Sequence, residues 1–206
     1  MKILAVSDME ASRYYTWYRP GCLKEFDLII SCGDLSRSYL EFLVTMANKP
    51  LLYVPGNHDD LFEKAPPEGC VCIDGCLHIF QGLRILGLGG SYRYKKDGKY
   101  MYTEKEMRRR ILRLKPKLFL HGGFDILVTH APARHINDLE SLPHRGFECF
   151  QTLMDQYHPS CFIHGHIHRN YGMHIPKRTV YGDTVIYNAC DDCEIELPLS
   201  PDEPEK

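Results

Sequence analysis

Five short polar clusters interrupt this sequence, and each one directly follows a short apolar stretch with the composition of a buried β-strand. In chain order the clusters are DME (8–10), GD (33–34), GNHD (56–59), TH (129–130) and GHIH (165–168). Helical stretches alternate with the strands, which is typical of an α/β chain. Because the loops beyond the carboxyl ends of such strands converge on one crevice, we expect the acids and imidazoles of these clusters to meet there.

The apolar pattern predicts strands at 2–7, 27–32, 50–54, 125–129 and 160–164. A helix over 36–47, capped by Ser36 or Ser38, is expected between the second and third of these strands. Short strands near 70–73, 77–80 and 83–88 are predicted to form a meander. These elements give the chain an alternating α/β arrangement.

The second half of the chain begins with a capping box at Thr103 and Glu106, which predicts the start of a helix. Pro116 is expected to break or restart that helix, and a further helix is predicted near 147–157. Short β segments near 171–174, 178–181, 185–189 and 193–197 close the chain. No internal repeat or linker divides the sequence.

The length of 206 residues suits one domain with a sizeable core, which we place at 1–198, followed by a disordered acidic tail at 199–206. A formal net charge of −2 predicts no general attraction to nucleic acid or to an anionic membrane, so nucleic acid is expected only as a substrate. No stretch approaches the ~18 apolar residues of a spanning helix, and no signal-peptide pattern is present, so we expect a cytoplasmic location and no membrane partner. The sequence indicates no particular oligomeric state.

The chain contains nine cysteines, an odd number that does not suggest a secreted disulfide framework. The runs around Cys70, Cys72 and Cys76, and the pair Cys190 and Cys193, resemble metal-binding spacings only loosely. We interpret the cysteines as reduced thiols. A zinc-stabilised nucleic-acid binder that uses these thiols and the basic run 108–110 is an alternative, although a solvated helix face is the simpler interpretation of that run.

The polar clusters offer carboxylate, amide and imidazole groups, which are the donors that Zn²⁺, Mn²⁺ and iron take in proteins. Each cluster alone is a weak signal, since a Gly-Asp pair is common and a lone histidine more often fills a turn. Their joint occurrence, in order and each after a strand, is far more specific. The number of donors suffices for two ions.

These residues resemble the calcineurin-like metallophosphoesterases from Ile3 to about Ala189, through the motifs CGDL, VPGNHDD, LVTHAP and HGHIH. The resemblance implies a four-layer αββα sandwich, in which two mixed β-sheets are flanked by helices and the metals lie at the strand ends. It also implies two divalent ions, which would be Mn²⁺, Fe²⁺/Fe³⁺ or Zn²⁺. One ion would be held by Asp8, Glu10, Asp34 and His168. The other would be held by Asp34, Asn57, His130 and His166, so that Asp34 bridges the pair.

The same resemblance makes His58 the proton donor to the leaving group. Asp59 would either orient His58 or cap the following helix, and we favour the cap. The implied function is that of a metal-dependent phosphoesterase, most simply a phosphodiesterase, which hydrolyses its substrate by in-line attack of a hydroxide shared by the two metals. The alternative is a catalytically impaired binding or scaffold protein with the same fold.

Glu10 departs from the family, in which the first motif is Asp-x-His. We favour Glu10 as a direct ligand that replaces imidazole nitrogen by carboxylate oxygen. It would otherwise lie beside the ligands and leave a coordination position open, or mark a damaged site that holds one ion or none. All other ligand positions match the family.

Substrate selection is expected from side chains around the metals. Arg93 and Arg134 are candidates to clamp phosphate, and Tyr92 or Tyr94 to stack on a base. His135, Asn170 and Tyr171 occupy similar positions in the sequence. Modest size and the lack of a basic groove favour a small or exposed phosphodiester, with monoesters as the second choice.

Overall fold

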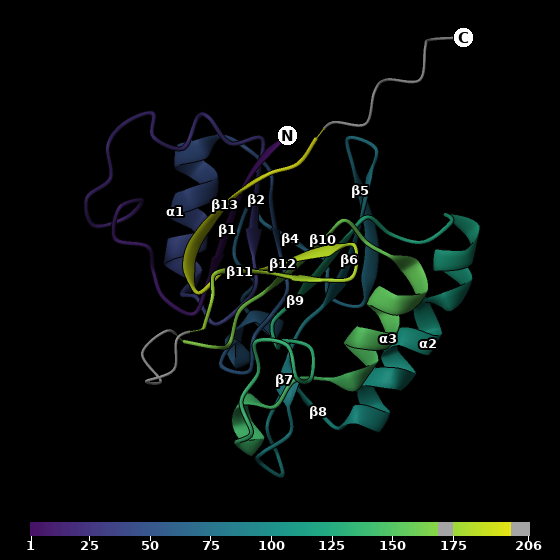
Figure 1. Ribbon diagram of the computed structural model, residues 1–206. Coiled ribbons are helices and arrows are strands. Elements are labelled where there is room, and N and C mark those ends of the chain that lie inside the picture. Colours follow the sequence, from purple (N-terminus) through teal and green to yellow (C-terminus); the bar gives the residue numbers. More distant parts are fainter. Residues whose placement is uncertain (169–174, 199–206) are drawn as a thin grey trace, which may run out of the picture.

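The computed structural model describes residues 1–168 and 175–198. Within them, two mixed sheets form the body of the protein (Figure 1). The first sheet has the order β13 (Asp191–Glu196), β1 (Lys2–Ser7), β2 (Leu28–Ser31), β3 (Leu51–Tyr53) and β4 (Val71–Cys72). Its strands are parallel except for β13, which pairs with β1 in the antiparallel sense.

The second sheet has the order β11 (Arg178–Tyr181), β12 (Thr184–Asn188), β10 (Cys161–His164), β9 (Ile126–Thr129), β6 (Leu83–Leu88) and β5 (Cys76–Phe80). Its four central strands are parallel, and the two edge strands are antiparallel to their neighbours. A small parallel pair is formed by β7 (Ser91–Tyr92) and β8 (Met101–Tyr102). Two short 3₁₀ helices, η1 (Asp60–Glu63) and η2 (Leu142–His144), lie in the loops.

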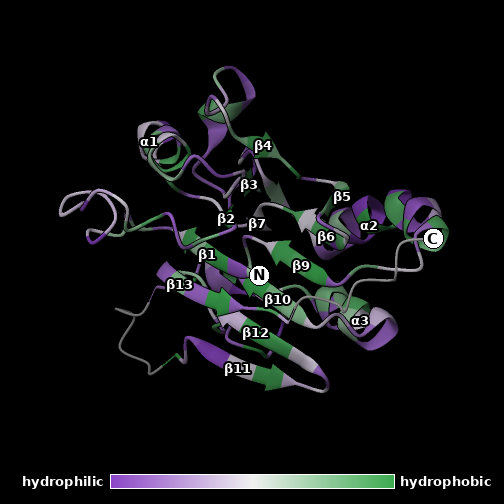
Figure 2. Ribbon diagram, turned by 90° about the horizontal axis from the view of Figure 1, so that it is seen from above, coloured by the Kyte–Doolittle hydropathy of each residue, from purple (hydrophilic) through white to green (hydrophobic). Residues whose placement is uncertain are grey.

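The alternation of side chains along the strands builds the layers. In β1, Ile3 and Ala5 enter the core between the two sheets, whereas Leu4 and Val6 pack on the other side, under α1 (Arg37–Ala47). The outer face of the second sheet is covered by α2 (Glu104–Leu120) and α3 (Glu148–Tyr157). Figures 1 and 2 show α1 on one side of the paired sheets and α2 and α3 on the other. The predicted four-layer sandwich is confirmed.

Both predicted helix starts are confirmed. Ser36 precedes α1, and its hydroxyl accepts a hydrogen bond from the Tyr39 backbone N–H at 3.2 Å. At α2, Thr103 accepts from the Glu106 N–H, and the Glu106 carboxylate accepts from the Thr103 N–H at 2.7 Å.

Pro116 does not end the second helix, contrary to the prediction. Helix α2 continues to Leu120, and its buried residues include Leu114 and Leu118 on either side of the proline. Packing of this apolar stripe on the sheet outweighs the loss of one backbone hydrogen bond.

The predicted meander at 70–88 is also wrong in its first strand. β4 pairs with β3 in the first sheet, and only β5 and β6 form a hairpin. The chain changes sheets at Ile73, which is buried in the core between the sheets and whose N–H donates to the Tyr53 carbonyl at 2.9 Å. A hairpin signal in the sequence does not reveal which sheet each strand joins.

The predicted β segment near 171–174 and the tail at 199–206 lie outside the described residues. All nine cysteines lie within them and are present as thiols. In the part of the chain that the structure describes, no helix is both long and apolar enough to cross a lipid bilayer.

Candidate metal centre

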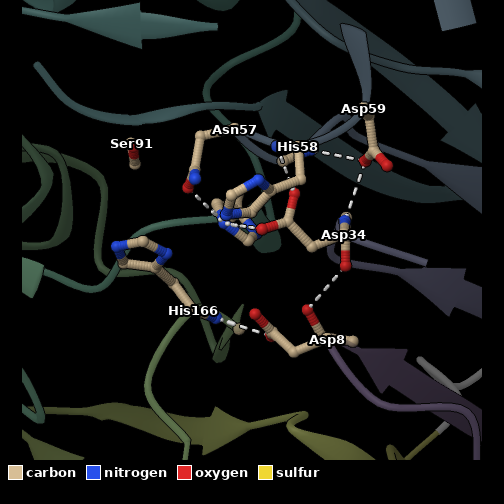
Figure 3. A network of polar contacts seen from close by, with 12 residues as sticks. Asp8, Asp34, Asn57, His58, Asp59, Ser91 and His166 are labelled. Carbon is tan, nitrogen blue, oxygen red and sulfur yellow. Dashed lines mark hydrogen bonds and ion pairs between the residues drawn. The ribbon is translucent and has the colours of Figure 1, made fainter. Parts of the chain in front are cut away.

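The polar clusters that follow β1, β2, β3, β9 and β10 meet at one end of the sandwich. Asp8, Asp34, His130 and His166 each offer a ligand atom, and these atoms lie within 4.8 Å of one another. Figure 3 shows how Asp8, Asp34, Asn57 and His166 surround a common space. Residues far apart in the sequence thus form one group because the parallel strands that carry them end at the same edge.

The backbone at these positions is held in an uncommon conformation. Asp8, Asp34 and His166 have φ values of 62°, 57° and 69°, in the left-handed region. Such conformations cost of order 1–3 kcal/mol each and persist only when their surroundings fix them. Here the Asp8 N–H donates to the Gly33 carbonyl at 3.1 Å. Gly33 itself must be glycine, because a Cβ there would lie 2.3 Å from the Gly56 backbone nitrogen.

The Asp8 carboxylate is ionised and incompletely partnered. Its Oδ2 accepts from the His166 backbone N–H at 2.7 Å. Its buried Oδ1 accepts no hydrogen bond from the described residues, and His168 Nε2 lies 3.4 Å away. Burial alone would raise the pKa of Asp8, but His168, His130, Ser7 and the hydrogen bond from the His166 N–H hold it at about 2.

His130 is oriented so that one ring nitrogen remains available. Its Nδ1 lies 2.7 Å from the Cys32 carbonyl, which only accepts, so Nδ1 carries a proton. Its Nε2 faces Asn57 Oδ1 at 3.1 Å and Asp34 Oδ2 at 3.4 Å. Burial opposes a charge on the ring, yet the Asp34 and Asp8 carboxylates raise the pKa of His130 to about 9. Nε2 is therefore the atom that would bind a metal after losing its proton.

A backbone carbonyl also orients His166, but here it contacts Nε2 and not Nδ1. Its Nε2 donates to the Pro143 carbonyl at 2.7 Å, which leaves Nδ1 as the ligand atom. Burial lowers the pKa of His166 well below its usual range, and the nearby His130 acts in the same direction. His144 lies beside it, with ring centroids 5.5 Å apart. Sequence reasoning missed Pro143 and His144, since neither stands in a motif and only the folded loop brings them to the site.

Asp59 does not have the capping role that the sequence favoured. Its side chain makes no capping hydrogen bond to η1. Its Oδ2 instead accepts from the backbone N–H groups of Asp34 and Gly56, at 2.8 and 2.7 Å. Burial, assisted by the Asp34 charge, raises the pKa of Asp59 to about 6. Asp59 thus joins the GNHD loop to the GD loop.

His58 lies next to this junction and is exposed. Its backbone N–H donates to Asp34 Oδ1 at 2.8 Å, so the position of His58 is tied to a metal-ligand candidate (Figure 3). The exposed imidazole can meet a substrate from solvent.

Glu10 does not join the group of four. It is exposed, and its carboxylate accepts a hydrogen bond from the Ser36 hydroxyl at the start of α1. Two other predicted ligands lie beside this group: Asn57 contacts His130, and His168 contacts Asp8.

The candidate substrate residues have partners within the protein. Arg93 pairs with both carboxylate oxygens of Glu106 at 3.0 Å. Tyr92 packs on Phe147, with ring centroids 5.5 Å apart. Arg134 donates to two carboxylates, described below. The Tyr94 hydroxyl accepts from Asn57 Nδ2 at 3.3 Å, while Asn170 and Tyr171 lie outside the described residues.

The arrangement fits a divalent cation. Two buried carboxylates repel each other unless positive charge lies between them. Asp8 Oδ1, which accepts no hydrogen bond from the described residues, and the two oriented imidazoles supply donors of the kind that Mn²⁺, Zn²⁺ and iron bind.

Comparison with known proteins identifies a family and a structure of similar fold. The calcineurin-like phosphoesterase family matches residues 1–170. The solved structure of TT1561 from Thermus thermophilus is similar in fold, with a TM-score of 0.64 and 18% identity, over 92% of this chain and 89% of that one. A protein of unknown function from Aquifex aeolicus, AQ665, aligns at a TM-score of 0.36 and 16% identity, over 76% of this chain and 92% of that one. No curated protein sequence gives a significant match.

Removing the Tyr94 hydroxyl tests how Asn57 is oriented. We expect Tyr94→Phe to weaken Mn²⁺ binding by about twofold to tenfold, since it removes the acceptor that keeps Asn57 Nδ2 turned away from the ligand group. Calorimetric titration of Mn²⁺ into the metal-stripped chain measures this effect. Tyr18→Phe is the matched control, and equal affinities in both variants would refute the role of Tyr94.

Replacing Glu10 tests whether its contact with Ser36 persists when metal binds. We expect Glu10→Ala to keep the Mn²⁺ stoichiometry of the unmodified chain, and Asp8→Ala to lose bound metal. Elemental analysis after gel filtration measures both. Loss of one equivalent from Glu10→Ala would instead show that this carboxylate swings to the ions, as the sequence suggested.

Proposed function

This chain belongs to the calcineurin-like phosphoesterase family, and we propose that it is a phosphodiesterase whose substrate is hydrolysed at the metal centre beside His58. The family and the group of potential metal ligands together make it a metal-dependent phosphoesterase. The preference for diesters, two ions as the metal content, and the role of His58 belong to the proposal.

The single observation that carries the proposal is the convergence of Asp8, Asp34, His130 and His166 within 4.8 Å. A protein that only uses the fold as a scaffold has no physical need for two buried like charges. Asn57 and His168 extend the donor set through their contacts with His130 and Asp8, and these six residues would hold the two ions of the proposal.

Bound divalent ions would supply a Lewis acid that neutralises the phosphoryl oxygens and makes water a better nucleophile. The residues of the chain supply the rest. His130 and His166 present fixed nitrogens, and Asp59 holds the backbone that carries Asp34. His58 is the group that would give a proton to the departing oxygen, a role that suits an exposed imidazole beside the ligand group.

The charges around the centre favour a diester over a monoester. Arg93 and Arg134, the residues expected to bind phosphate, both form ion pairs with carboxylates of the protein. A monoester dianion needs more positive charge at the reacting group than a diester monoanion does. A small or exposed phosphodiester is therefore the substrate class that we propose.

Hydrolysis of bis-p-nitrophenyl phosphate in the presence of Mn²⁺ tests the activity. We expect turnover that a chelator abolishes and added Mn²⁺ restores. Asp34→Asn should lower it by at least ~10², since this carboxylate would touch both ions. Metal-loaded protein without turnover of any phosphoester would instead favour the binding or scaffold alternative.

Comparison of two leaving groups tests His58. Proton donation of this kind contributes ~10²–10⁴ in rate, and it matters most when the leaving group is a poor one. His58→Asn should therefore slow hydrolysis of an alkyl diester far more than that of bis-p-nitrophenyl phosphate. Steady-state rates on both substrates measure the difference, and equal losses would contradict the assignment.

A further inference from the structure

We propose that a cavity lined by Arg145, next to the metal centre, binds a second phosphate group of the substrate. The inference rests on the proposed function and narrows it to phosphodiesters that carry an additional phosphate. The cavity has a volume of about 210 Å³. Pockets that enclose a drug-sized ligand measure ~300–1,000 Å³, so this one fits a single group of a larger substrate.

Arg145 belongs to the loop whose Pro143 carbonyl orients a metal-ligand candidate, His166. The Pro143 carbonyl accepts from His166 Nε2 at 2.7 Å, and Arg145 follows two residues later. Because successive Cα atoms lie 3.8 Å apart, the Arg145 Cα is within about 7.6 Å of the Pro143 Cα. His144, between them, has its ring 5.5 Å from that of His166.

A second part of the cavity wall belongs to β7. Tyr92 lines the cavity, and the guanidinium of Arg145 lies over its ring at 5.7 Å from the centroid. Two residues after Tyr92, the Tyr94 hydroxyl contacts Asn57. The cavity is thus bounded by two segments that each also touch a metal-ligand candidate.

Arg145 brings to this cavity a positive charge that forms no ion pair within the described residues, and an acid that feels that charge is the exposed Glu140, which pairs with Arg134. Its Nε is buried and has no hydrogen-bond partner among the described residues. No carboxylate in that part of the chain lies within 4.0 Å of its guanidinium nitrogens, the limit for an ion pair. A buried N–H without an acceptor carries a desolvation cost, and the charge of Arg145, which lines the cavity, would be stabilised by a bound anion.

The other arginine of the cavity is already neutralised. Arg134 Nη1 donates to Asp138 Oδ2 at 2.7 Å, and its Nη2 donates to Glu140 Oε2 at 2.8 Å. Arg134 therefore shapes the wall and leaves Arg145 to attract an anion.

The two carboxylates that line the cavity do not cancel the charge of Arg145. Glu104 accepts from the backbone N–H groups of Glu148 and Cys149 at the start of α3, and from Arg108 at 2.9 Å. Glu148 is largely exposed to solvent and lies 3.5 Å from Arg108. Both acids are thus directed toward α2 and α3.

The geometry of Arg145 favours phosphate as the anion. A guanidinium offers a planar fork of donors that matches two phosphate oxygens. Packing of one face on Tyr92 limits the orientations of this fork and leaves its edge for a ligand.

The test compares thymidine 5′-phosphate with thymidine 3′,5′-bisphosphate as ligands of the Mn²⁺-loaded chain, by calorimetry. We expect the bisphosphate to bind about tenfold to a hundredfold more tightly, since it adds one charge-assisted contact. Arg145→Ala should reduce that preference to less than about twofold, whereas Arg145→Lys should keep part of it. Arg109→Ala, an exposed arginine of α2 outside the cavity, is the matched control.

Two results would overturn the proposal. One is an unmodified chain that binds both nucleotides equally. The other is an Arg145→Ala variant that weakens both ligands by the same factor, which would make Arg145 a support for the loop over His166. Thermal unfolding of each variant verifies that it is folded.

The experiment separates this proposal from the proposed function because binding needs no turnover. A preference for the bisphosphate that depends on Arg145, in a chain that hydrolyses no diester, would uphold the cavity and reject the activity. Hydrolysis of bis-p-nitrophenyl phosphate by a chain that shows no preference for the bisphosphate would uphold the activity and reject the cavity.

Discussion

The two buried carboxylates, Asp8 and Asp34, impose the constraint on which the rest of the site depends. Like charges out of contact with water are costly unless hydrogen-bond donors and opposite charges surround them. The protein supplies the donors from its own backbone, at His166 and His58, and the opposite charge from His130. Each donor comes from a different loop, so the site is complete only when both sheets have closed on one another.

Backbone groups rather than side chains do most of the positioning. The carbonyls of Cys32 and Pro143 each fix which nitrogen of an adjacent imidazole is free, and the Asp59 carboxylate binds two backbone N–H groups. Backbone atoms move little once the strands are paired, which makes them a rigid frame for metal ligands. The same frame extends through Pro143 into the η2 loop and so couples the metal centre to the cavity beside it.

The distribution of positive charge separates the reacting group from the rest of a substrate. Arg93 and Arg134 form ion pairs with carboxylates of the protein, whereas the described residues provide no ion pair for Arg145 and no hydrogen-bond partner for its Nε. The positive charge that contacts the reacting phosphoryl group would therefore come from the ions. The positive charge that contacts the rest of the substrate would come from Arg145. The carboxylate of Glu10 adds no negative charge to the ligand group, because in the folded chain it accepts a hydrogen bond from Ser36 at the start of α1.

The sequence by itself determined most of the strands, because apolar periodicity is a local signal. Through the resemblance of its motifs to the metallophosphoesterases, the sequence also predicted the four layers and the ligands, of which Asp8, Asp34, His130 and His166 lie close together. It did not determine that β4 would join the first sheet, that α2 would run through Pro116, or that Asp59 would bind two backbone N–H groups. Each of these depends on partners that are distant in the chain. Likewise, no pattern marks Pro143 or Arg145, since a carbonyl's direction and a cation's lack of a partner exist only once the loops are packed.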